Sequence, residues 1–254
     1  MASEPISLRG VILTSREFKD KDRIISFLSS TAGVIDICVK GTGKQGSKLQ
    51  SATIPFVVCD VVISMTGSFY YLKEVSLVYS NSEIYQNLEA LVCANHIGSL
   101  LSSSYIEQTN SREFYELCVY TYYKLSEKPS DFKIIYSAFN WRFLNILGLN
   151  IQYDLCSGCS SKLDSYTYLS LTTGESYCNP CFQKKAYNEY LFPMSGAAIK
   201  ALNYFLTADL KKLFSVNLDN ESLDQLVDFT TKYIDSQLEG TYDELIDLLK
   251  KIGS

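Results

Sequence analysis

Histidine is almost absent from this chain, which includes one His, one Trp and five Pro among 254 residues. Most general acid–base and triad chemistry uses imidazole, so the single His96 argues against an enzyme. It falls in Leu91–Leu101, whose apolar spacing is typical of an amphipathic helix. We therefore expect a structural role for His96 and no catalytic residues.

Long apolar runs are also lacking. The longest nearly apolar stretch is Ile54–Met65, and Asp60 interrupts it. A helix that crosses a membrane needs roughly 20 apolar residues, so no membrane partner is expected. Met1–Arg9 has no basic region followed by an apolar core, so a secretory signal is not expected and a cytoplasmic location is the default.

Charge is present in moderate amount and is unevenly distributed. The chain has 23 Lys and Arg against 28 Asp and Glu, and 46% of its residues are apolar, which is typical of a globular protein. Its length favours two or three compact units. Residues 1–80 carry nine basic and seven acidic side chains, whereas residues 193–254 carry six and ten. A basic face on an N-terminal unit is one interpretation, and chance clustering is the alternative.

The first 80 residues show the alternation and β-branched content of strands. The predicted strands are Leu8–Thr14, Arg23–Ser30, Val34–Lys40, Pro55–Met65 and Phe69–Tyr79. Five short strands with tight turns and one long polar loop predict a small closed barrel, and the OB-fold has this strand count. The fold class expected is therefore α+β and multidomain, beginning with a five-stranded OB-fold barrel.

After Ser80 the apolar spacing becomes helical. The clearest predicted helices are Phe132–Leu147, Gly196–Leu206, Ser222–Leu238 and Tyr242–Lys251. The domains expected are residues 1–80 for the barrel, 81–152 with 193–254 for one discontinuous helical domain, and 153–192 for an insertion.

The predicted insertion contains four cysteines. Cys156 and Cys159 form one C-x-x-C pair, Cys178 and Cys181 form a second, and 18 residues lie between the two pairs. The tight turn within each C-x-x-C pair can place both sulfurs on one metal ion. Two such turns can complete a tetrahedral four-thiolate site, and this separation is typical of structural zinc. Disulfides and a redox motif are the alternatives, both disfavoured by the expected compartment and by the doubled motif. The other cysteines, isolated in apolar runs, are expected to be buried thiols: Cys38, Cys59, Cys93 and Cys118.

A glycine-rich string, Gly41–Gly46, follows a predicted strand and matches G-x-G-x-x-G. No amphipathic helix follows it to hold a pyrophosphate, so we interpret it as a basic loop and not a nucleotide site. On a face of the predicted barrel, the aromatic residues Phe69, Tyr70 or Tyr71 could stack on bases. Alternation places Phe69 and Tyr71 on one face of the strand and Tyr70 on the other, and core packing is the alternative role for each.

Taken together, these features resemble the RecO family of bacterial recombination mediators. The resemblance extends over nearly the whole chain and is carried by Leu8–Thr14, Asp22–Ile25, Ala32-Gly33, Val39–Gly41, Lys48-Leu49, Pro55-Phe56, Phe143-Leu144, Leu147-Gly148, Asp154–Cys156, the two cysteine pairs and the return to helices near Pro193–Gly196. It implies an OB-fold that binds single- and double-stranded DNA, a helical domain and a zinc-ribbon-like insertion. It further implies partnership with RecR and SSB, help in loading RecA, strand annealing and no nucleotide hydrolysis.

The loop at residues 41–48 departs from the family pattern, because it is usually dense in Arg and Lys and here keeps only Lys44 and Lys48. The expected phosphate contacts are Arg9, Arg16, Arg23, Lys40, Lys44 and Lys48. The expected zinc ligands are Cys156, Cys159, Cys178 and Cys181. The competing hypothesis is a protein–protein scaffold with weak or no direct DNA binding. A zinc enzyme is disfavoured because four cysteine ligands leave no open coordination position.

Overall fold

The computed structural model of the protein describes residues 4–18, 22–41, 53–104, 108–163, 165–184 and 190–238. The chain divides into two compact units, Met1–Ser130 and Asp131–Ser254. Among the described residues, the first unit contains a barrel and two α-helices, and the second contains four α-helices and a small sheet. The domain boundaries expected from the sequence, at residues 80, 152 and 192, stay a prediction.

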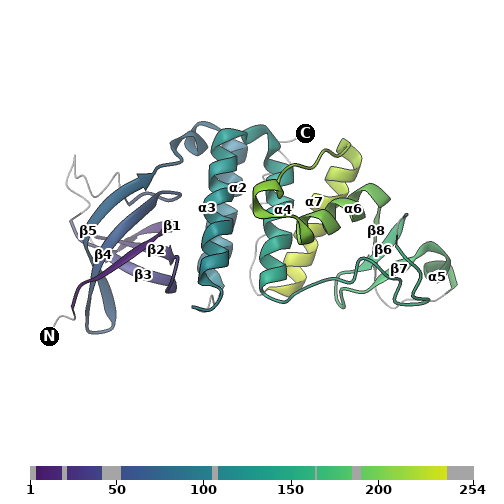
Figure 1. Ribbon diagram of the computed structural model, residues 1–254, viewed down its shortest axis with the longest axis horizontal. Coiled ribbons are helices and arrows are strands. Elements are labelled where there is room, and N and C mark those ends of the chain that lie inside the picture. Colours follow the sequence, from purple (N-terminus) through teal and green to yellow (C-terminus); the bar gives the residue numbers. More distant parts are fainter. Residues whose placement is uncertain are drawn as a thin grey trace. The chain divides into compact units, whose positions relative to one another are not determined.

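Five strands of the first unit form a closed barrel in the order β1-β2-β3-β5-β4. The strands are β1 (Ile6–Phe18), β2 (Asp22–Ser29), β3 (Gly33–Val39), β4 (Val58–Thr66) and β5 (Phe69–Tyr79). All pair antiparallel except β3 and β5, which run parallel where Ile37 faces Tyr70 and Cys38 faces Tyr71. Five strands in a closed barrel followed by helices confirm the predicted OB-like, α+β fold (Figure 1).

Alternate residues of each strand fill the barrel. The fully buried members of this core include Ile12, Ile25, Phe27, Ile37, Val39, Cys59, Val61 and Ile63. Tyr70 and Leu72 of β5 pack against it, so the residue between them, Tyr71, points away from the interior. Phe69 shares that outer side and is 54% exposed. The predicted separation of Phe69 and Tyr71 from Tyr70 is confirmed.

Two helices pack against the barrel in the same unit. After the short η1 (Ser82–Gln86) come α2 (Leu88–Ser103) and α3 (Ser111–Glu127). The side chain of Asn87 caps α2 by accepting a hydrogen bond from the Ala90 N–H at 2.8 Å. The Oγ of Ser111 accepts from the Gly33 N–H at 2.9 Å, so the start of α3 is tied to the β2–β3 turn. The helix predicted around His96 is confirmed, because Leu91–Leu101 lies within α2, and His96 is buried there.

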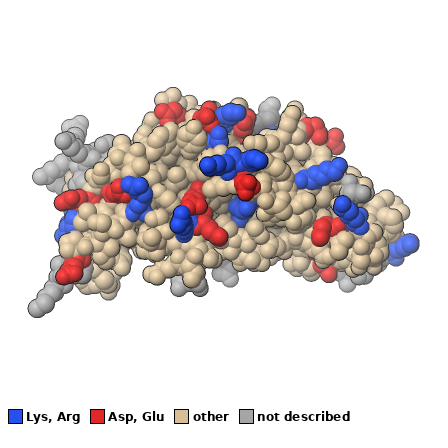
Figure 2. Space-filling view, viewed as in Figure 1, with Lys and Arg blue, Asp and Glu red and all other residues tan. Residues whose placement is uncertain are grey.

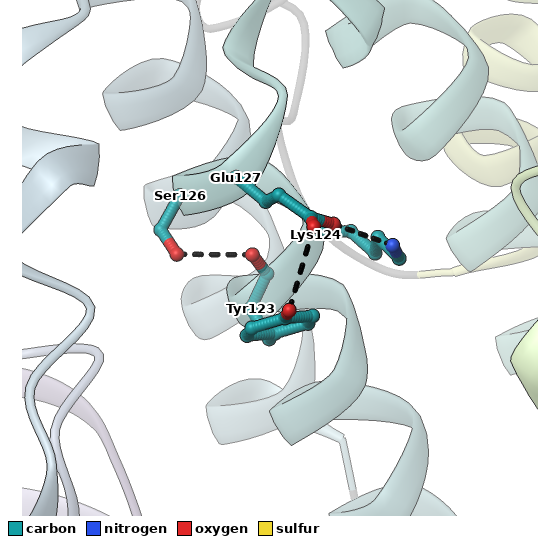
Figure 3. A network of polar contacts seen from close by, with 4 residues as sticks. All are labelled: Tyr123, Lys124, Ser126 and Glu127. Carbon is teal, nitrogen blue, oxygen red and sulfur yellow. Dashed lines mark hydrogen bonds and ion pairs between the residues drawn. The ribbon is translucent and has the colours of Figure 1, made fainter.

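Polar contacts hold the last turn of α3 (Figure 3). Lys124 pairs with Glu127 at 2.5 Å, and the Tyr123 hydroxyl donates to the same carboxylate at 3.4 Å. The Ser126 hydroxyl donates to the Tyr123 carbonyl at 2.9 Å. A cation near a helix C-terminus is also favoured by the helix dipole. The polar side chains at the end of α3 therefore find their partners within the same turn.

Three helices among the described residues of the second unit pack against one another. They are α4 (Phe132–Ile146), α6 (Gly196–Thr207) and α7 (Asn220–Gln237), with the short η2 (Pro129–Asp131) before α4 and η3 (Leu210–Lys212) after α6. Trp141 of α4 stacks on Phe229 and Tyr233 of α7, and its Nε1–H donates to the Thr230 hydroxyl at 2.7 Å. These helices confirm three of the predicted ones; Tyr242–Lys251 lies outside the described residues.

A three-stranded sheet, in the order β7-β6-β8, lies between α4 and α6 in the sequence. It consists of β6 (Thr167–Ser170), β7 (Ser176–Cys178) and β8 (Leu191–Met194), with the short helix α5 (Asn179–Lys184) after β7. The second cysteine pair thus sits at the junction of β7 and α5. No described helix has the length and apolar character required to span a membrane.

We predict that Gly98→Ala destabilises the first unit, because α2 lies directly against β1 at this glycine. A Cβ there would lie 2.6 Å from the Leu13 carbonyl oxygen, which cannot move without moving the strand. Overpacking costs roughly 1–3 kcal/mol, which should exceed the ~1 kcal/mol that Ala gains over Gly in helix propensity. Chemical denaturation measures the change. Ser99→Ala, at the exposed neighbouring position, is the control and should have little effect; equal stability of both variants would contradict the packing described.

Candidate metal centre and nucleic-acid interface

Four cysteine sulfurs converge in the second unit. The Sγ atoms of Cys156, Cys159, Cys178 and Cys181 all lie within 4.8 Å of one another. Cys156 is buried, Cys178 and Cys181 are half-buried and Cys159 is exposed. A small apolar cluster that includes Leu163 and Tyr177 packs around Cys156. Four thiols so close together could hold one metal ion.

The first cysteine pair is shaped by its backbone. The Ser160 N–H donates to the Cys156 carbonyl at 2.7 Å, and the Gly158 N–H points to the Cys156 Sγ at 3.4 Å. A Cβ on Gly158 would lie 3.1 Å from the Cys181 Sγ and 3.2 Å from its Cβ, so only glycine lets the two pairs approach this closely without a shift. The sequence predicted a tight turn here.

Hydrogen bonds stabilise negative charge on two of the sulfurs. Burial would raise the pKa of the Cys156 thiol, but N–H groups of Cys178, Gly158 and Cys159 lower it below its ordinary value. The hydroxyl and N–H of Ser161 lower the pKa of Cys159 to about 6. Hydrogen bonds with the Cys159 and Cys178 sulfurs raise the pKa of Cys181 to about 12. Metal ligation requires thiolates, and a cation among the four sulfurs would favour that form. Ser161 was not identified from the sequence, because only the folded turn brings its hydroxyl to 3.1 Å from the Cys159 Sγ.

A row of residues in the first unit lies on the side of the barrel wall that faces away from its core, and the two middle ones, Ile24 and Cys38, are buried. The strand registers pair Arg16 of β1 with Ile24 of β2, Ile24 with Cys38 of β3, and Cys38 with Tyr71 of β5. We call these four residues the outer row. With strands about 4.8 Å apart, the backbone positions of Arg16 and Tyr71 at its ends are separated by roughly 14 Å along the curved wall of the barrel, and by less in a straight line. The nucleic-acid site of OB-folds commonly lies on the strand 2–3 face of the barrel, where this row runs.

One end of the outer row combines an aromatic ring with a cation. The Lys40 Nζ lies 4.7 Å from the centroid of the Tyr71 ring, a cation–π geometry. Lys40 is exposed, and no carboxylate of the described residues forms an ion pair with it. Phe69 lies two residues from Tyr71 on the same side of β5. A ring beside a cation on an exposed strand can accept a base and a phosphate.

At the other end of the outer row the cation is already paired. The Arg16 Nη2 lies 3.2 Å from the Asp36 Oδ2, and the Ser26 hydroxyl donates to the Asp36 Oδ1 at 2.6 Å. Cys38 lies among these charges. Burial raises the pKa of its thiol, Asp22 and Asp36 raise it further, and Lys40 and Arg16 oppose the rise. Arg16 and Lys40 therefore act on one common region.

The other predicted phosphate contacts lie elsewhere. Arg9 on the β1–β4 side donates two hydrogen bonds to Asp60, at 2.8 and 2.7 Å, and lowers the pKa of the Asp60 carboxyl. Arg23 donates to the Ser15 hydroxyl at 2.8 Å and is half-buried. Lys44 and Lys48 lie outside the described residues. The structure thus brings together Arg16 and Lys40, and Arg9 is on a different side of the barrel.

Basic side chains do not gather into one broad patch on the face seen in Figure 2, where Lys and Arg are interspersed with Asp and Glu. The partners Asp36 and Asp60 were not identified from the sequence. Strand pairing brings each aspartate to its arginine. Asp60 lies directly across from Arg9, and Asp36 lies across from Ser26 on β2, the strand between β3 and the β1 strand that carries Arg16. Sequence separations of 20 and 51 residues give no local signal for these pairs.

Known proteins are similar to this chain over nearly its whole length. A family model described as the N-terminal part of recombination protein O matches residues 1–81, and one for its C-terminal part matches residues 85–245. The chain belongs to the recombination protein O (RecO) family. It is 26% identical to the DNA repair protein RecO of Clostridium acetobutylicum over 244 residues, 96% of each chain. The RecO of Clostridium kluyveri is 24% identical, over 97% of this chain and 93% of that protein.

The DNA repair protein RecO of a Thermoanaerobacter species is 24% identical, with 92% of this chain and 93% of that protein covered. The matched residues include both the barrel and the helical second unit of this chain. Membership in the RecO family indicates a DNA repair and recombination protein. The resemblance stated from the sequence motifs is therefore confirmed.

We predict that Cys178→Ser weakens metal binding by more than the roughly 10–100-fold that loss of an outer-shell partner costs, because it removes a ligand itself. Bound metal is measured by elemental analysis after dialysis against a chelator. Cys38→Ser, a cysteine in the barrel, is the matched control and should retain the metal of the unaltered protein. Full retention of metal by Cys178→Ser would show that the cluster is not the binding site.

Proposed function

We propose that this protein is a non-enzymatic mediator of recombinational repair that binds single- and double-stranded DNA on the outer row of its barrel. In this proposal it anneals complementary strands and, together with RecR, helps to load RecA onto single strands coated by SSB. The observation that carries the proposal is the pairing of Lys40 with Tyr71 on the outside of an OB-like barrel. Membership in the RecO family supports it independently.

The outer row can bind a single strand without reading its sequence. A base stacking on Tyr71 or Phe69 uses a π-face that every base has, and Lys40 beside the ring can neutralise a phosphate. Each phosphate neutralised releases condensed counterions, so affinity should fall as salt rises. Binding is then tolerant of sequence and sensitive to salt.

Annealing follows from the same electrostatics. Two complementary strands repel each other through their phosphates, and cations on a shared surface lower that repulsion. The roles with RecR, SSB and RecA are supported by kinship to RecO proteins and not by a described surface. Because a chromosome under repair lies in the bacterial cytoplasm, the proposal also places the protein there.

The four-cysteine cluster fits structural zinc. A tetrahedron of sulfurs with Zn–S bonds of about 2.3 Å has edges of roughly 3.8 Å, and the Cys159 and Cys178 Sγ atoms are 3.7 Å apart. When bound, zinc would have its four coordination positions filled by thiolates. It would stabilise residues 153–190 without catalysing a reaction. The ligands would be Cys156, Cys159, Cys178 and Cys181.

A second candidate function is a protein–protein scaffold with weak or no direct DNA binding. One observation favours it: two cations proposed to contact phosphate, Arg9 and Arg16, are ion-paired with Asp60 and Asp36. A strand would have to displace or share those carboxylates. In that case the protein reaches DNA through its partners.

We predict distinct effects of two variants on binding of a labelled single-stranded oligonucleotide, measured by anisotropy across a range of salt. Lys40→Gln should weaken binding and reduce the salt slope by about 0.7, the value for one phosphate on a single strand. Tyr71→Leu should weaken binding by about 1–3 kcal/mol, as loss of one stacked base does, and leave the slope unchanged.

Lys128→Gln, an exposed cation beyond the end of α3, is the control for a general loss of charge and should change neither quantity appreciably. Absence of binding by the unaltered, folded protein at low salt would instead support the scaffold. Binding that neither Lys40→Gln nor Tyr71→Leu alters would exclude the outer row as the site.

A further inference from the structure

Asp36 is held between two partners on the outside of the barrel. One carboxylate oxygen accepts from the Ser26 hydroxyl at 2.6 Å and the other lies 3.2 Å from the Arg16 guanidinium. Ser26 is buried, whereas the Arg16 and Asp36 side chains are 62% and 53% exposed. The serine thus fixes the carboxylate from beneath and directs it at an arginine that solvent can reach.

The position of Asp36 opposes the proposed binding of DNA. It lies on β3 two residues from Cys38 of the outer row, and its neighbours on the same side are Arg16 and Lys40. When a phosphate approaches Arg16, the guanidinium is already ion-paired with the Asp36 carboxylate. Carboxylates and phosphates make the same kind of hydrogen bond with this group, so the two compete for it.

The second arginine–aspartate pair of the barrel has a different geometry. Arg9 engages both oxygens of Asp60 with two hydrogen bonds of 2.8 and 2.7 Å, a fork arrangement that is strong and directional. Arg16 engages Asp36 through one nitrogen at 3.2 Å. The Arg16–Asp36 pair is therefore the one that can exchange partners readily.

We propose that Asp36 is an internal competitor for DNA phosphate at Arg16 and thereby limits the affinity of the barrel for single strands. The proposal rests on the proposed DNA-binding function and adds a residue that restrains it. Arg16 is available to a strand only when it leaves the carboxylate, so the strand is held less tightly and released sooner. A protein that passes a strand to others requires such release.

The test is a double-mutant cycle on binding of the same labelled oligonucleotide at low salt. Asp36→Asn keeps an oxygen that can accept from Ser26 and removes the charge. It should tighten binding about two- to fivefold, since an exposed ion pair is worth up to about 1 kcal/mol, and steepen the salt slope by up to about 0.7 as Arg16 gains a phosphate. In the Arg16→Gln background the same change should give no gain, because the released group is missing.

Asp60→Asn is the matched control, since it removes an equal charge from the other pair on the β1–β4 side. A gain as large as that of Asp36→Asn would show a general charge effect and overturn the proposal. Unchanged or weaker binding by Asp36→Asn in a protein that itself binds DNA would also overturn it, while leaving the DNA-binding function in place. If neither the unaltered protein nor Asp36→Asn binds the oligonucleotide at low salt, the proposed function fails and this inference fails with it.

Folding of each variant is checked by thermal unfolding. Should Asp36→Asn not fold, Ser26→Ala is the second variant, because it removes the hydrogen bond that directs the carboxylate at Arg16. The proposal then predicts a smaller gain in affinity that again depends on Arg16. Loss of affinity in Ser26→Ala would contradict it.

Discussion

The parallel pairing of β3 with β5 is the constraint on which the candidate DNA site depends. These strands are separated in sequence by β4 and a long connection, and their contact closes the barrel. Closure fixes which residues point outward, because side chains alternate along every strand. It places Tyr71 beside Cys38, and through β2 it aligns both with Arg16. Without this pairing the outer row would not exist.

Electrostatics on the outer row is balanced rather than simply basic. Lys40 lies over Tyr71, but Arg16 is neutralised by Asp36 and the pair is exposed to solvent. Exposed pairs of this kind contribute little stability, so their partners can be exchanged at small cost. The net charge of −5 for the whole chain adds no long-range attraction for DNA. In the proposed function, affinity for DNA therefore comes from stacking and from a few local cations.

Much of this architecture could be predicted from local sequence patterns. The strands of the barrel and the two cysteine pairs were recognisable because alternation and ligand spacing are properties of short segments. The ion pairs of Arg9 and Arg16 were not, since they depend on the register of strands that lie far apart in the chain. That is why six cations appeared equivalent in the sequence, whereas the structure joins only Arg16 and Lys40 on one face and Lys44 and Lys48 lie outside the described residues.

Crosslinking tests the central claim most directly, because it reports where a strand lies. The protein is bound to an oligonucleotide containing 5-iodouracil, and the complex is irradiated. The protein is then digested, and its modified residues are identified by mass spectrometry. Stacking on Tyr71 of the outer row and on the neighbouring Phe69 predicts attachment at these two residues of β5. Attachment confined to exposed aromatic residues elsewhere, such as Tyr123 of α3 or Tyr190 of the second unit, would contradict the account.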